Sequence, residues 1–169
     1  MDFTTASADL SLSKEMIYDK AEMLLTSLQK ENESQEYSAY RFLLNSKHIC
    51  YREAKITPTK TGQFVTLWKR NQTGSIAPFD YSDTIDLVIV SVRKDQNWGH
   101  FIFPKKILLE KGIFSTQNKE GIRATRVYPP WDQTTSKQAQ KTQKWQLDYF
   151  FLFTNPDQIN LNEIRKILA

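Results

Sequence analysis

Residues 14–30 carry apolar side chains at helical intervals, with polar side chains between them. These apolar residues are Ile17, Ala21, Leu24, Leu25 and Leu28. Ser13 precedes them at a position suited to a helix N-cap. Because such spacing places one apolar stripe on one side of a helix, the pattern predicts an amphipathic helix from Lys14 to Lys30.

Shorter apolar and alternating runs follow, and they predict strands. The predicted strands cover Tyr40–Leu44, His48–Thr57, Gln63–Arg70, Ile85–Val92, Trp98–Phe103, Ile122–Tyr128 and Trp145–Phe153. The run Ile85–Val92 is apolar almost throughout, which is typical of a strand covered on both faces. We therefore expect this strand to be the buried centre of a mixed sheet of five or more strands.

Local signals predict three further helices. Pro104 stands where one would begin and Gly112 where it would end, and good helix formers extend from Ser136 to Lys144. Asn160 to Glu163 resembles a capping box for a C-terminal helix over residues 160–168. Together the elements predict one α/β domain over residues 1–169, with a mixed β-sheet flanked by helices and a motif-bearing core over residues 36–153.

The composition agrees with one soluble domain. The 169 residues are 40% hydrophobic and 12% aromatic, which is enough apolar surface for one core. The lone cysteine, Cys50, permits no internal disulfide, and the N-terminus lacks the basic and apolar regions of a signal peptide. No apolar run approaches membrane-spanning length. We expect a cytoplasmic protein with no membrane partner.

The net charge of +4 is unevenly distributed along the chain. Residues 1–40 hold three basic and eight acidic residues, whereas residues 41–169 hold twenty basic and eleven acidic ones. A basic body favours polyanions such as DNA or RNA as partners, although many ordinary soluble domains carry a similar surplus.

Glu53 and Lys55 form a Glu-x-Lys triplet on a predicted strand. Alternation along a strand would place both heads on one face, the arrangement that metal-dependent nucleases use to hold Mg²⁺ and polarise a phosphate. A second carboxylate would be needed, and the candidates are Asp80, Asp83 and Asp86. All three follow the triplet, whereas the nuclease pattern places its first Asp before it. A surface ion pair is the alternative interpretation, and we expect no bound metal or other cofactor.

The predicted strand Gln63–Arg70 would carry Phe64, Trp68 and Arg70 on one face. These side chains could form a stacking platform for bases with a cation at its end. The alternative is that another element covers the rings as part of the core.

Further cations and rings lie downstream. Lys137, Lys141 and Lys144 form one stripe on the predicted helix, which would suit phosphates or could be a solvated face. The candidate nucleic-acid-binding residues are Lys55, Lys60, Trp68, Lys69, Arg70, Arg126, Tyr128, Trp131, Lys137, Lys141 and Lys144. If they serve one site, Lys55, Lys60, Arg70, Arg126 and Lys141 should converge on one concave face.

Several longer blocks resemble the MepB family. They are residues 54–60, 62–70, 78–80, 101–105, 126–131 and 139–146, within a stretch from about residue 36 to 150. The resemblance implies a bacterial protein with a restriction-endonuclease-like α/β core, encoded beside a multidrug efflux pump and its repressor. In the family the position of Glu53 varies while Arg52, Ala54 and Lys55 recur, which favours binding over cleavage.

Three functions follow from these observations. The first is nucleic-acid binding without cleavage. The second is a Mg²⁺-dependent nuclease in which Glu53 and an aspartate such as Asp86 would chelate the metal and Lys55 would steady the phosphate. The third is a small-ligand or protein-interaction module in which the aromatic residues line a pocket.

Overall fold

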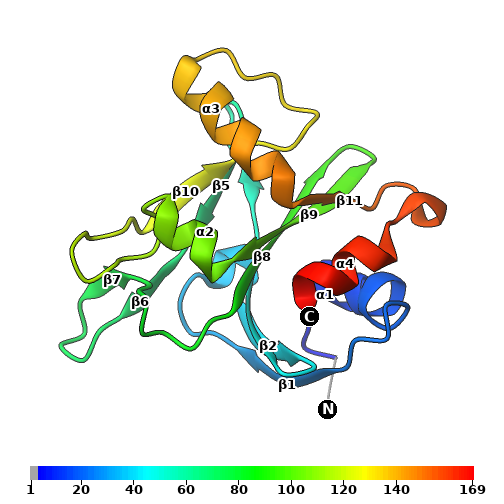
Figure 1. Ribbon diagram of the computed structural model, residues 1–169, viewed down its shortest axis with the longest axis horizontal. Helices are drawn as coiled ribbons and strands as arrows, with labels where there is room; N and C mark the ends of the chain where they lie inside the picture. The colour runs from blue at the N-terminus through cyan, green and yellow to red at the C-terminus, as the bar shows by residue number, and fades with distance from the viewer. Residues whose placement is uncertain (1–3) are drawn as a thin grey trace.

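A six-stranded mixed sheet forms the centre of the molecule (Figure 1). The computed structural model describes residues 4–169. In spatial order the strands are β1 (Leu25–Lys30), β2 (Tyr40–Leu44), β3 (Lys47–Glu53), β8 (Leu87–Lys94), β9 (Asn97–Pro104) and β11 (Phe150–Leu152). The pair β3 and β8 is parallel, and the other neighbouring pairs are antiparallel. The predicted mixed α/β fold, with Ile85–Val92 supplying a central strand, is confirmed.

Two smaller sheets extend from this centre. One has the order β10 (Ala124–Val127), β5 (Gln63–Thr66) and β4 (Lys55–Ile56), and the other pairs β6 (Trp68–Arg70) with β7 (Ile76–Pro78). The single strand predicted over Gln63–Arg70 is therefore interrupted at Leu67. The backbone N–H of Leu67 bonds to the carbonyl of Arg123, 2.9 Å away, where the chain leaves one sheet for the other.

The helices are α1 (Ala8–Ser13), which continues as a π-helical turn over Lys14–Tyr18, then α2 (Lys105–Glu110), α3 (Lys137–Gln146) and α4 (Leu161–Leu168). Short 3-10 turns cover Gln35–Tyr37, Leu147–Tyr149 and Pro156–Gln158. The predicted cap of α4 is present, because the Asn160 side chain accepts a hydrogen bond from the backbone N–H of Glu163. Within residues 4–169, no helix has both the length and the apolar character needed to cross a membrane.

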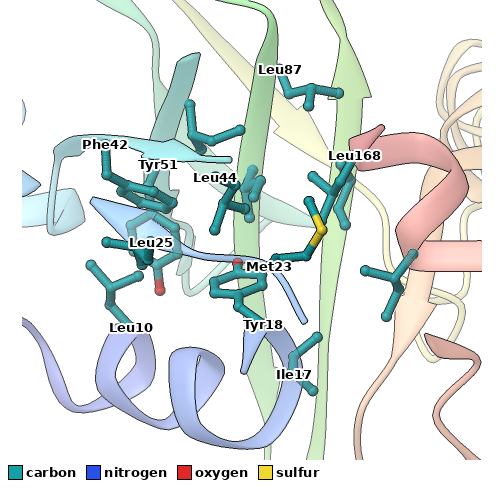
Figure 2. Close-up of a cluster of buried hydrophobic side chains, with 14 of the residues drawn as sticks. Leu10, Ile17, Tyr18, Met23, Leu25, Phe42, Leu44, Tyr51, Leu87 and Leu168 are labelled. Carbon is teal, nitrogen blue, oxygen red and sulfur yellow. The ribbon is translucent and has the colours of Figure 1, made fainter. Parts of the chain in front are cut away.

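Apolar side chains pack on both faces of the central sheet. Along β8, Ile89 belongs to one cluster and its neighbours Val88 and Val90 to the other, as alternation requires. The first cluster lies under α1 and α4, and Figure 2 shows Leu10 and Ile17 directed from the first helix toward the sheet. The second lies under α2, α3 and the small sheets.

The prediction of one helix over Lys14–Lys30 is wrong. Ser7 caps the first helix, whereas Ser13 is buried and bonds to the Asp9 carbonyl and to His100. Helical structure ends at Tyr18, and residues 25–30 form β1. A bulge between Thr26 and Gln29 allows Leu25 and Leu28, three positions apart, to contact the same core. The spacing thus imitated a helix.

The strand predicted over Trp145–Phe153 is much shorter than expected. Helix α3 runs to Gln146, and only Phe150–Leu152 is extended. Trp145 and Tyr149 both contact the ring of Phe103, with centroids 5.5 and 6.0 Å away. Two side chains four positions apart share a helical face, so the alternation of aromatic residues here fitted helical turns as well as a strand.

Candidate functional site

Lys55, Phe64 and Arg126 lie side by side across the three-stranded sheet. Phe64 on β5 is in register with Lys55 on β4 and with Arg126 on β10. The neighbouring residues Val65 and Val127 are fully buried in the second core. Because side chains alternate along strands, the row formed by Lys55, Phe64 and Arg126 occupies the opposite, outer face.

Tyr37 completes this row from the irregular segment between β1 and β2. Its ring meets the edge of Phe64 with centroids 6.1 Å apart. The Lys55 ammonium lies 5.3 Å from the centre of the Tyr37 ring, and the Arg126 guanidinium lies 5.7 Å from that of Phe64. Each cation thus rests on an aromatic face, and neither forms an ion pair with a carboxylate among the described residues. We call these four residues the outer row.

Arg126 also fixes the turn between β4 and β5, which carries Lys60. Its guanidinium donates to the Thr57 hydroxyl at 2.9 Å and to the Thr61 carbonyl at 3.4 Å. Gly62 ends the turn at a φ of +83°, a conformation that favours glycine, and a Cβ there would lie 2.6 Å from the ring of Tyr128. Tyr128 therefore packs against the turn beside the outer row.

The rest of the predicted stacking platform is contacted by the segment 31–37, which carries Glu33. Segment 31–37 crosses the same strand face, where Glu33 binds the Arg70 side chain at 2.7 Å and Ser34 bonds to Thr66. The Arg70 guanidinium rests 5.5 Å from the ring of Trp68. Arg70 is thus neutralised by an acid remote in sequence, and it lies in a sheet separate from Lys55 and Arg126.

Lys69 is neutralised as well. Its ammonium lies 2.8 Å from Asp80 and 2.7 Å from Asp83. Burial acts to raise the pKa of Asp80, but hydrogen bonds from Lys69 and Ser82 outweigh it and lower the pKa from 3.8 to about 2. Asp80 and Asp83 are therefore both engaged in ion pairs with Lys69.

Glu53 faces inward rather than toward Lys55. Its carboxylate accepts hydrogen bonds from the Ser7 hydroxyl and from the Tyr51 hydroxyl, the latter at 2.9 Å. Burial raises the pKa of Glu53, the hydrogen bonds oppose the rise, and the charge of Asp9 adds to it. Within residues 4–169, no ion pair joins Glu53 to Lys55, so the surface ion pair that was the alternative interpretation is not present.

The residues do not fit a two-carboxylate metal site at the triplet. Asp86 accepts the backbone N–H of His48 at 2.7 Å, at the opposite end of β3 from Glu53. In the described part of the chain, no three His, Cys, Asp or Glu side chains are grouped so that they could hold a metal ion. Asp9, which no sequence pattern marks, raises the pKa of Glu53 through its charge, and it forms an ion pair with Arg93 at 2.7 Å.

The α3 stripe remains open to solvent. Lys137, Lys141 and Lys144 are exposed, and they form no ion pair with any residue of the described range. Helix α3 lies beside the end of β10, because Gln146 bonds to the backbone of both Arg126 and Tyr128 (Figure 1). The shared binding surface of Lys141 and Lys55 stays a prediction.

Trp131 is partly buried in the loop between β10 and α3. Its ring meets the edge of Phe150 with centroids 5.8 Å apart. Trp68 instead lines a cavity of about 600 Å³, whose walls also carry Glu31, Arg41 and Arg70. The predicted aromatic residues are therefore distributed over three places: the outer row, this cavity and the Trp131 loop.

Comparison with known proteins identifies the family. A family model described as MepB-like matches residues 31–152. A solved structure of MepB is 34% identical, with a TM-score of 0.78, and the match covers 88% of this chain and 99% of that one. A bacterial homing endonuclease superposes at a TM-score of 0.45 and 10% identity, over 85% of this chain and 94% of that one, a likeness too distant to bear on function.

Curated proteins offer no match. The family model begins at Glu31, within the acidic segment that packs on β5 and β6, and ends at Leu152 in β11. It therefore includes the outer row, the turn that carries Lys60 and the α3 stripe. With the model matching most of the chain and the MepB structure matching nearly all of it, the chain belongs to the MepB-like family.

Proposed function

We propose that this protein is a nucleic-acid-binding module that does not cleave its ligand. The outer row carries the proposal: two cations and two rings, aligned on the outer face of the small sheet, where Lys55 is exposed and the other three residues are partly exposed. Neither cation has an acidic partner within residues 4–169. The cations accept phosphates, and the guanidinium plane of Arg126, which lies over Phe64, can stack on an unstacked base, as in other proteins that bind single strands or splayed bases.

The contrast among the cations supports this surface over the one around Lys69 and Arg70. Lys69 and Arg70 are each bound by carboxylates, so a phosphate would have to displace an existing partner. Lys55 and Arg126 rest on rings, and Arg126 donates only to uncharged oxygens of Thr57 and Thr61, so a phosphate would displace no carboxylate. Binding at the outer row therefore loses less existing electrostatic stabilisation.

The test is binding of single-stranded DNA, duplex DNA and RNA over a range of salt concentrations. Each phosphate contact contributes about 0.7 to 0.9 to the negative slope of log affinity against log salt. Lys55→Gln is expected to reduce that slope by about this amount, whatever the sequence bound. Lys106→Gln is the matched control, because Lys106 is exposed on α2 and contacts only Glu110 at 3.9 Å.

Two results would contradict the proposal. Failure to bind any DNA or RNA at low salt would favour a small-ligand module, for which the 600 Å³ cavity beside Trp68 is a candidate site. Cleavage that requires Mg²⁺ and is abolished by Glu53→Gln would instead establish a nuclease. We expect no cleavage, because Glu53 is directed toward Ser7 and Tyr51.

A further inference from the structure

A cleft of about 480 Å³ opens between the β4–β5 turn and the Trp131 loop. The turn contributes Thr57, Thr59 and Lys60, and the opposite wall contributes Lys94, Trp131 and Asp132. Its volume lies within the range of about 300–1,000 Å³ typical of small-molecule sites. Arg126 of the outer row binds this same turn, so the turn connects the outer row to one wall of the cleft.

The cleft presents two cations that are available to an anion. In the described part of the chain, the Lys60 ammonium has no acidic partner. Lys94 has only Asp132, at 3.9 Å, and its side chain is half exposed. Threonine hydroxyls stand beside Lys60 on the turn, and hydroxyl groups are common partners of phosphate oxygens.

Trp131 supplies an aromatic wall. Trp131 lines this cleft and also a neighbouring hollow of about 320 Å³. Its indole N–H is buried and has no acceptor among the described residues. The position of Trp131 at the cleft suits a ligand that carries a flat ring.

We propose that the cleft holds one unstacked nucleotide of a single strand, with its phosphate on Lys60 and Lys94 and its base against Trp131. The inference rests on the proposed function, since the rest of the strand would cross the outer row. Bases in a duplex are stacked and paired and cannot enter such a cleft without being flipped out. The protein therefore prefers single strands to duplexes.

A substitution of Asp132 tests the proposed phosphate position. The Asp132 carboxylate faces this position and holds Lys94, so it opposes binding of an anion. Asp132→Asn removes that charge with little change in shape, and it is expected to tighten binding of a short oligothymidylate several-fold. If Asp132 had only a structural role, the substitution would leave affinity unchanged or weaken it.

The remaining variants separate the base from the phosphate. Trp131→Ala is expected to weaken binding of the oligothymidylate about 5- to 150-fold with little change in salt slope, while binding of a duplex of equal length stays the same. Lys60→Gln and Lys94→Gln are each expected to reduce the slope for the single strand by about 0.7. Trp131→Phe keeps an aromatic face and is expected to lose less than Trp131→Ala.

Affinities would be measured by fluorescence anisotropy, with Lys106→Gln as the control lysine and circular dichroism to verify folding. The cleft proposal is overturned if these variants bind the single strand as the unmodified protein does, or if the duplex loses as much affinity as the single strand. In either case Lys55→Gln would still test the outer row. Absence of binding to all nucleic acids would overturn the proposed function itself.

Discussion

Replacing Glu31 by Gln is expected to lower the free energy of unfolding by about 3–5 kcal/mol, because it leaves a buried arginine without its counter-charge. Arg52 is fully buried, and its guanidinium contacts the Glu31 carboxylate. The backbone carbonyls of Thr66 and Tyr51 accept from Arg52 at 3.1 and 2.9 Å, but they carry no net charge. One terminal nitrogen of Arg52 has no acceptor among the described residues, so the loss of Glu31 would leave the guanidinium charge poorly compensated.

Glu33→Gln is the matched control. Glu33 lies on the same segment and also binds an arginine, but the side chain of Arg70 is half exposed, so the loss should stay within about 1 kcal/mol. Urea unfolding would measure both variants. Adding Arg52→Met to Glu31→Gln should recover part of the loss, because the unpaired charge is removed. Equal effects of the two glutamate variants would show that Glu31 is not the required counter-charge.

Acidification is expected to destabilise the protein through His100. This side chain is fully buried, near the Ser13 hydroxyl at 3.2 Å and the Tyr18 hydroxyl at 3.4 Å. Burial, with a smaller contribution from Arg93, lowers the pKa of His100 from 6.5 to about 3. The unfolded chain therefore binds a proton below pH 6.5 that the folded chain excludes. Stability should fall by about 1.4 kcal/mol per pH unit from pH 6.5 down to about pH 3.

Three carboxyl groups modify this curve, and they do not all act in the same direction. Burial raises the pKa of Glu53 and of Asp132, so the folded chain binds these protons more readily than the unfolded chain, which offsets part of the loss. The lowered pKa of Asp80 adds a loss as the pH falls from 3.8 to about 2. Because the carboxyl groups are the same in both proteins, the difference between the curves of the unmodified protein and a His100→Gln variant isolates the contribution of His100.

The measurement is the free energy of unfolding in urea at a series of pH values. His100→Gln should flatten the decline below pH 6.5, since glutamine does not titrate, even if it lowers stability at neutral pH. His48→Gln is the control, because the His48 side chain is 43% exposed. A decline that persists unchanged in His100→Gln would assign the acid sensitivity to other groups.

The sequence alone was sufficient for the fold class. An apolar run such as Ile85–Val92 can be stabilised only between two covering layers, so it predicts a buried strand wherever the other elements lie. The cap at Asn160 is likewise local, because its donor is three residues away. The region 14–30 failed for a physical reason: Leu25 and Leu28 are three positions apart, a spacing that a helix and a bulged strand both satisfy.

Only the tertiary structure decided which cations remain available. Lys55, Lys69 and Arg70 look alike in the sequence, yet Lys69 and Arg70 are neutralised by Asp80, Asp83 and Glu33 while Lys55 rests on Tyr37. No local pattern marks these partners, because they are brought together by sheet pairing and by an irregular segment. Charge interactions depend on distance in space, and the sequence specifies that distance only within a helical turn or between neighbouring strand positions.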